Sequence, residues 1–141
     1  MRTSHNGLLL IEKHEGCYLT SYLCPAGVWT VGIGHTRTAK QGITITKKQA
    51  YDLLQSDLEI AEAVVLQSLQ GLNQNQFDAL VSLVFNIGGG NFRSSTLLKK
   101  IKQNAPESEI REQFAAWVYA KHKRLPGLIK RRLEESELYF S

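Results

Sequence analysis

Apolar residues recur at helical spacing over most of this 141-residue chain. The strongest pattern opens at the capping box Thr46-Lys47-Lys48-Gln49 and ends at Gly71. Its apolar side consists of Ala50, Leu53, Leu54, Leu58, Ala61, Val64 and Val65. A second helix is predicted from residues 73–75 onward, and the run Gly88-Gly89-Gly90 is expected to stop it in a turn. Shorter helices are predicted at residues 4–14, 95–103, 106–120 and 126–139.

The segment 18–36 lacks the helical spacing of apolar residues seen in the rest of the chain. Pro25 and three glycines break any helix there, and the stretch Val28–Ile33 is rich in strand-forming residues. We therefore predict a small antiparallel sheet near the N-terminus and an α+β fold. The chain is read as one domain, 1–141, with a sheet lobe at about 15–45, a connecting helix at 46–70 and a helical lobe at 71–141. A cleft between the two lobes is the expected ligand site.

Composition narrows the classes of protein to which the chain can belong. The chain is long enough to bury a core, and no run approaches the roughly 20 apolar residues of a membrane span. The run Leu8–Ile11 is too short for the apolar core of a signal peptide, so neither a signal peptide nor a signal anchor is expected. No His and Cys spacing resembles a metal site, and we expect no metal and no cofactor. We expect a monomer that does not insert stably into a membrane.

The formal net charge is +4, which favours polyanionic partners such as wall polymers, nucleic acid or lipid headgroups. Nucleic acid is not expected, because neither a helix-turn-helix nor an aromatic stacking pattern is present. The basic residues of the C-terminal part are expected to form a solvated helix face, with attraction to an anionic surface as the alternative. They are Arg111, Lys121, Lys123, Arg124, Lys130, Arg131 and Arg132.

Glu15 is the candidate that carries chemistry. It ends a helical pattern directly before the predicted sheet, among apolar and aromatic residues. A carboxylic acid in such surroundings can keep its proton near neutral pH. This property suits cleavage of a glycosidic bond, in which the leaving oxygen must be protonated.

Four parts of the sequence together resemble the signature of tailed-phage lysozymes, or endolysins, of glycoside hydrolase family 24. They are Glu15-Gly16, Tyr22, Gly27-Val28-Trp29-Thr30 and Gly32-Ile33-Gly34-His35-Thr36. The resemblance continues through Phe77–Gly88, Arg93–Leu98, Trp117-Val118-Tyr119, Leu125–Leu128 and Arg131-Arg132, in order along nearly the whole chain. It implies a mainly helical lysozyme-like fold. It also implies a muramidase that hydrolyses the β-1,4 bond between N-acetylmuramic acid and N-acetylglucosamine in peptidoglycan.

The resemblance assigns roles to individual residues. Glu15 is the general acid, and Thr30 helps to hold the attacking water. Cys24 stands where the family usually carries Asp, and its thiolate can stabilise positive charge, orient water as a base, or attack carbon as a nucleophile. His35 and Asp57 match a structural ion pair behind the active site that ties the sheet to the long helix. Apart from the resemblance, Phe85 and Asn86 end the central helix where it should face the cleft, so we expect them to contact sugar. Core packing is the alternative for Phe85, and Thr96 is a weaker candidate for substrate contact.

Cys17 lies two residues after Glu15. Its simplest role is a buried apolar side chain, and both cysteines are expected to be free thiols in a reducing cytoplasm. The alternative is a redox pair, in which oxidation joins Cys17 to Cys24, consumes the thiol of the active site and stops the enzyme.

Two other functions stay open on the sequence alone. A lytic transglycosylase would cut the same bond without water, and a non-catalytic basic module would bind the cell wall without turnover. The resemblance further implies accumulation in the host cytoplasm and release through a holin. The protein would then act on the peptidoglycan of the periplasm.

Overall fold

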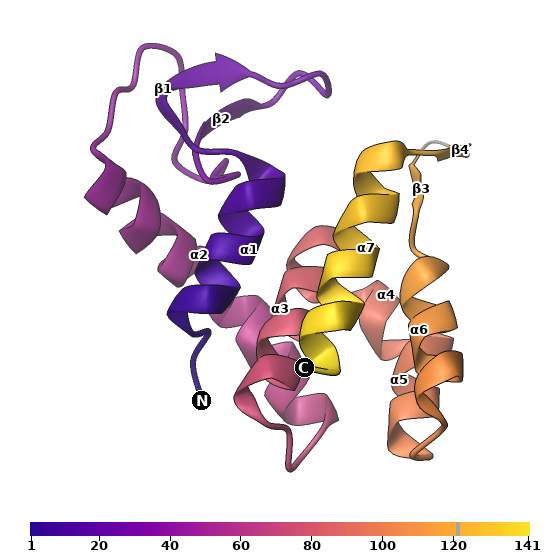
Figure 1. The fold of residues 1–141 in the computed structure, drawn as a ribbon. Helices are drawn as coiled ribbons and strands as arrows, with labels where there is room; N and C mark the ends of the chain where they lie inside the picture. Colours follow the sequence, from indigo (N-terminus) through magenta and orange to yellow (C-terminus); the bar gives the residue numbers. More distant parts are fainter. Residues whose placement is uncertain (121) are drawn as a thin grey trace.

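A computed structural model describes residues 1–120 and 122–141 (Figure 1). Within these residues the chain forms seven helices and two antiparallel sheets of two strands each. The elements are α1 (His5–Glu15), β1 (Tyr18–Leu23), β2 (Trp29–Gly32), α2 (Lys47–Ser68), α3 (Gln74–Ile87), α4 (Gly89–Arg93), α5 (Thr96–Lys102), α6 (Glu107–Ala115), β3 (Tyr119–Ala120), β4 (Lys123–Arg124) and α7 (Pro126–Tyr139). The α+β, mainly helical fold predicted from the sequence is confirmed.

The predicted N-terminal sheet consists of β1 and β2. Leu23 pairs with Trp29 and Tyr18 pairs with Gly32, with a register shift between the two pairs. A second link forms where Thr20 bridges to Thr44, so that the chain leading to α2 covers the free edge of β1. The sheet stands above α1 and the start of α2 (Figure 1).

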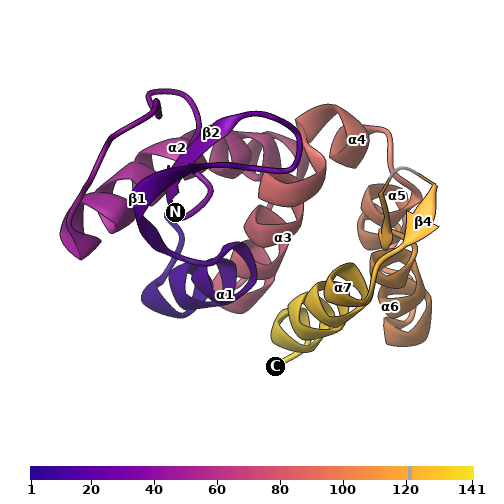
Figure 2. The same ribbon diagram turned by 90° about the horizontal axis from the view of Figure 1, so that it is seen from above.

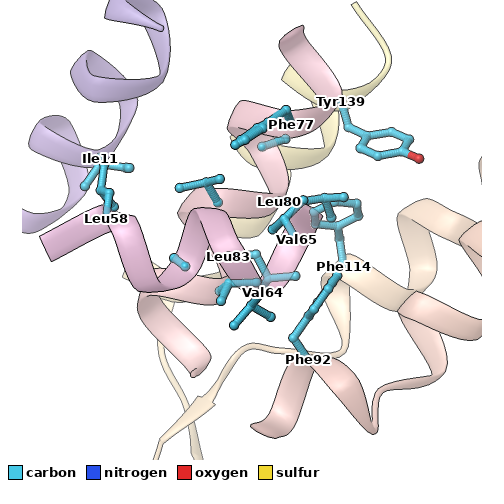
Figure 3. Close-up of a cluster of buried hydrophobic side chains, with 14 of the residues drawn as sticks. Ile11, Leu58, Val64, Val65, Phe77, Leu80, Leu83, Phe92, Phe114 and Tyr139 are labelled. Carbon is cyan, nitrogen blue, oxygen red and sulfur yellow. The ribbon is translucent and has the colours of Figure 1, made fainter. Parts of the chain in front are cut away.

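Helix α3 lies at the centre of the molecule. It contacts α1, α2, α4 and α7, and the views in Figures 1 and 2 agree on this central position. All of its residues from Phe77 to Val84 are buried. The main apolar core forms around it, as Figure 3 shows for Leu80 and Leu83 beside Val64 and Val65 of α2. Because these buried residues are consecutive, they cover all sides of the helix, and this part of α3 is buried all round.

Two segments differ from the prediction. The glycine run does not form a simple turn: Gly88 has φ +92°, which redirects the chain, and a new short helix α4 begins at Gly89. The helix predicted at 106–120 ends at Ala115, and Trp117-Val118-Tyr119 leads into a short hairpin of β3 and β4 instead. These three residues are good strand formers, and this preference prevails over continuation of the helix. Lys121 lies outside the described residues.

No helix in the described part of the chain is both long and apolar enough to cross a membrane.

Candidate active site

Glu15 is the last residue of α1 and lies at the junction with the sheet lobe. The chain turns away at Gly16, which has φ +79°. The backbone at Gly34 approaches the carboxylate so closely that a Cβ there would lie 2.9 Å from Glu15 Oε1. The side chain of Glu15 keeps 24% of its surface exposed. The carboxyl group is therefore held against the sheet lobe and still reachable by a ligand.

The other carboxylate oxygen of Glu15 accepts a hydrogen bond from Arg131 of α7, with Nη1 2.6 Å from Oε2. The expectation of a solvated basic face is wrong for Arg131 and Arg132, because both side chains are buried. The physical reason is Glu135, which is fully buried and pairs with both arginines. The spacing of Arg131 and Glu135 on one helix was the available signal for this contact.

Cys24 follows β1 and opens the turn that leads to β2. Its backbone N–H donates to the Val28 carbonyl at 3.0 Å, and its own carbonyl accepts from Gly27 N–H at 2.8 Å. Hydrogen bonds from the backbone at Val28, Ala26 and Gly27 hold the pKa of the Cys24 thiol below its ordinary value. This turn therefore favours a thiolate.

Thr30 lies in β2 and is buried, and its hydroxyl also donates to the Val28 carbonyl at 3.1 Å. Tyr22 of β1 was given no role in the sequence analysis. Burial, followed by negative charge on Tyr18, Cys24 and Glu15, raises the pKa of the Tyr22 phenol.

Two cavities flank Glu15. One of about 580 Å³ is lined by Glu15 and Asn86, together with Lys13 and His14 of α1 and the first residues of α7. The other, of about 300 Å³, lies between the loop after β2 and helix α2, and Phe85 lines it with Gly34. Gly34 lines the second cavity and approaches the Glu15 carboxylate, so both cavities lie near the acid. Thr96 lines neither cavity.

His35 and Asp57 lie on the side of the second cavity that faces α2. His35 Nδ1 is 2.7 Å from Asp57 Oδ2, and the other ring nitrogen, Nε2, is 2.6 Å from the Thr38 hydroxyl. His35 is buried, and its backbone bridges to Val31 of β2. The pair thus connects the sheet lobe to helix α2.

The two cysteines are free thiols, and the described structure does not bring them together. They flank β1 at its opposite ends. The two ends of β1 pair with Gly32 and Trp29 of β2. These two residues are three steps apart along an extended strand, which corresponds to about 10 Å. A disulfide needs Cα atoms within about 7 Å. A bond between Cys17 and Cys24 therefore requires β1 to leave its partner.

In the described residues no group of three or more His, Cys, Asp or Glu side chains is arranged to hold a metal ion. The mainly helical fold and the partly buried acid that lines an open cavity define a lysozyme-type glycoside hydrolase. The family model described as phage lysozyme matches residues 12–135. The chain belongs to the phage lysozyme family.

Similar proteins cover the whole chain. An endolysin from Acyrthosiphon pisum secondary endosymbiont phage 1 is 43% identical over 100% of this chain and 99% of its own length. The endolysin of Salmonella phage P22 is 35% identical with the same two coverages. The muramidase domain of SpmX from Asticaccaulis excentricus superposes with a TM-score of 0.91 at 33% identity, over 99% of this chain and 98% of the domain.

The phage P1 endolysin Lyz has been solved in two forms. The active form matches this structure with a TM-score of 0.89 at 29% identity, over 99% of this chain and 85% of that one. The secreted inactive form matches with a TM-score of only 0.63 at 30% identity, over 99% and 96%. The structure described here is therefore closer to the active form.

The two thiols should differ in reactivity. Burial raises the pKa of Cys17, whereas the turn lowers that of Cys24, so Cys24 should carry more thiolate at neutral pH. With limiting iodoacetamide, mass spectrometry should find Cys24 alkylated several-fold faster than Cys17. The difference should vanish in urea. Equal rates in the folded protein would contradict the electrostatic role of the turn.

The His35–Asp57 pair should support the fold. Asn at position 35 is too short to reach both Asp57 and Thr38, and it should lower the free energy of unfolding by about 1–3 kcal/mol. Urea denaturation at neutral pH measures this, with His5→Asn at an exposed position as the matched control. An unchanged urea midpoint for His35→Asn would show that the pair does not stabilise the protein.

Proposed function

We propose that the chain hydrolyses the β-1,4 bond between N-acetylmuramic acid and N-acetylglucosamine in peptidoglycan, with Glu15 as the general acid. The observation that carries this proposal is the position of Glu15, which lines a cavity of about 580 Å³, keeps 24% of its side chain exposed and is held by Arg131. A glycan strand in the cleft would present its bridging oxygen to Glu15 Oε1, the oxygen that Arg131 does not hold. Proton transfer to that oxygen breaks the bond.

Cys24 and Thr30 complete the proposed site. Positive charge develops on the sugar ring as the bond breaks, and a thiolate on the sheet side stabilises it. Thr30 positions the water. The lowered pKa of Cys24 supports a charged role, as base, nucleophile or electrostatic partner, over that of an inert apolar side chain.

Substrate contacts are proposed for Phe85 and Asn86, which line the two cavities at the end of α3. Phe85 is half-buried and offers a ring face, and Asn86 is exposed and offers an amide. Thr96 receives less support, because it lines neither cavity.

We also propose how the protein reaches its substrate. The protein accumulates in the host cytoplasm, a holin releases it, and it then acts on periplasmic peptidoglycan. The support is membership of a family whose named relatives are phage endolysins.

The test is lysis of permeabilised Gram-negative cells in reductant. Glu15→Gln should lower activity by about 10²- to 10⁴-fold, since it removes the proton donor without changing shape. Cys24→Ser should also lower it strongly. Glu137→Gln, on the exposed side of α7, and Cys17→Ser are the matched controls and should retain activity. Undiminished lysis by Glu15→Gln would contradict the proposal.

The products of this lysis assay distinguish hydrolysis from lytic transglycosylation. Replacement of the family's Asp by Cys favours the second reaction, and the buried, hydrogen-bonded Thr30 favours water. Mass spectrometry of the released fragments decides, because only hydrolysis adds one water to the new end.

A redox control of this site is also proposed. Two-electron oxidation would join the Cys17 and Cys24 sulfurs, with both thiol protons and both electrons passing to the oxidant. Such a bond requires β1 to rearrange. The active and secreted inactive forms of P1 Lyz match the present structure with different TM-scores, 0.89 and 0.63, which supports a change of this kind.

Oxidation with diamide should therefore abolish lysis by the wild type, and dithiothreitol should restore it. Cys17→Ser should remain active after the same treatment, because Cys24 then lacks its partner. Full activity of the oxidised wild type, with the disulfide verified by mass, would exclude this control.

A further inference from the structure

A third cavity, which we call the α6–α7 groove, lies between helices α6 and α7 and has a volume of about 490 Å³. Val118 and Arg124 line it from the hairpin of β3 and β4. Figures 1 and 2 both show α6 and α7 side by side, with the hairpin next to the start of α7. The groove shares no lining residue with the two cavities near Glu15. Its volume is within the range of about 300–1,000 Å³ that is typical of small-molecule sites.

The walls of the groove are largely apolar. Ala115 of α6 lines one side, and Ile129 and Leu133 of α7 line the other. Val118 is buried, whereas 54% of the surface of Leu133 is exposed. A large apolar side chain that is exposed inside an apolar groove is stabilised when an apolar ligand covers it.

Three arginines border this apolar surface: Arg111 of α6, Arg124 of β4 and Arg132 of α7. Arg111 is paired with Glu107 at 3.2 Å, and Arg124 is exposed. Glu112 is the acid among the lining residues, and it is also exposed. Cations therefore outnumber anions around the groove, which favours a ligand that carries negative charge.

Arg132 has a donor without an acceptor. Its side chain is only 1% exposed, its Nε lies 2.9 Å from Glu135 Oε1, and its Nη2 donates to Asn86 Oδ1 at 2.7 Å. The remaining nitrogen, Nη1, is buried and has no hydrogen-bond partner in the described part of the chain. A buried donor without a partner is unfavourable. Because Arg132 lines the groove, a ligand in the groove can supply the missing acceptor.

We propose that the α6–α7 groove binds a free fatty acid. The alkyl chain lies on the apolar walls at Ile129 and Leu133, and the carboxylate accepts hydrogen bonds from the guanidinium groups of Arg132 and Arg124. A carboxylate matches the planar fork of donors that a guanidinium group presents. The volume of the groove suits a single alkyl chain rather than the two chains of a membrane phospholipid.

This inference is independent of the proposed hydrolysis, because Glu15 does not line the groove. Glu15→Gln should therefore bind the fatty acid as the wild type does. Loss of lysis in this variant with unchanged binding supports both proposals, and the result of either experiment can fail without the other.

The first measurement is isothermal titration calorimetry with dodecanoate, kept below the concentration at which it forms micelles. We expect saturable binding of one molecule per chain. Dodecanol has the same chain without the charge and should bind several-fold more weakly. Butyrate has the same carboxylate and too short a chain to cover Leu133, so it should show no binding at the same concentrations.

Variants at exposed positions locate the site, and circular dichroism verifies that they fold. Leu133→Gln should weaken dodecanoate binding about fivefold or more, since it removes apolar surface that the chain covers. Arg124→Gln should weaken binding and Glu112→Gln should strengthen it, each by about two- to fivefold. Leu66→Gln on α2 and Lys123→Gln on β4 are the matched controls outside the groove and should change nothing.

Equal affinity for dodecanoate and dodecanol, or wild-type affinity in Leu133→Gln, would overturn the proposal. Two further measurements test other occupants of the groove. A dimer in sedimentation analysis that Leu133→Gln converts to a monomer would show that a second copy of the chain covers it. Flotation with phosphatidylglycerol vesicles that Leu133→Gln abolishes would show that a membrane surface does. Either of these results would also overturn the fatty-acid site.

Discussion

A carboxylate without access to solvent is costly unless charged partners surround it, and Glu135 meets this constraint with two arginines of its own helix. The arrangement draws Arg131 and Arg132 inward across the contact between α7 and α3. Once buried, the guanidinium groups need further acceptors. They find them on Ser82 and Asn86 of α3 and on Glu15 of α1. Three helices that form the helical side of the cleft are thereby fixed to one another through polar contacts.

The sheet lobe is held by different means. Glycines at positions 32 and 34 adopt positive φ, and Gly34 leaves room for the carboxylate of Glu15 where any side chain would collide with it. The His35–Asp57 pair then joins this loop to α2. The acid is consequently enclosed by two rigid supports, an arginine on one side and a glycine backbone on the other. Such support is what a general acid requires, because small displacements of the proton donor reduce catalysis strongly.

The cysteine in the turn after β1 has a thiol whose pKa depends on local backbone geometry. N–H groups of the turn hold this pKa below its ordinary value. The same strand that carries Cys24 at its end keeps Cys17 at the other end, so the reduced fold and a Cys17–Cys24 bond exclude each other. The active form of the relative P1 Lyz matches this structure better than its secreted inactive form does.

Helix periodicity, caps and glycine punctuation determined most of the secondary structure from the sequence, because these signals act within a few residues. The capping box at Thr46 and the pattern of 126–139 predicted the starts of α2 and α7 closely. The local signal failed where two preferences competed, at Gly88–Gly90 and at Trp117–Tyr119.

The sequence also indicated Glu15 as a candidate from its local surroundings, and the resemblance to phage lysozymes added Cys24 and Thr30. The sequence analysis wrongly expected Arg131 and Arg132 to face solvent, as arginines on a surface helix usually do. Only the packing of α7 on α3 decided that these arginines lie inside, because burial of a charge depends on partners from distant parts of the chain.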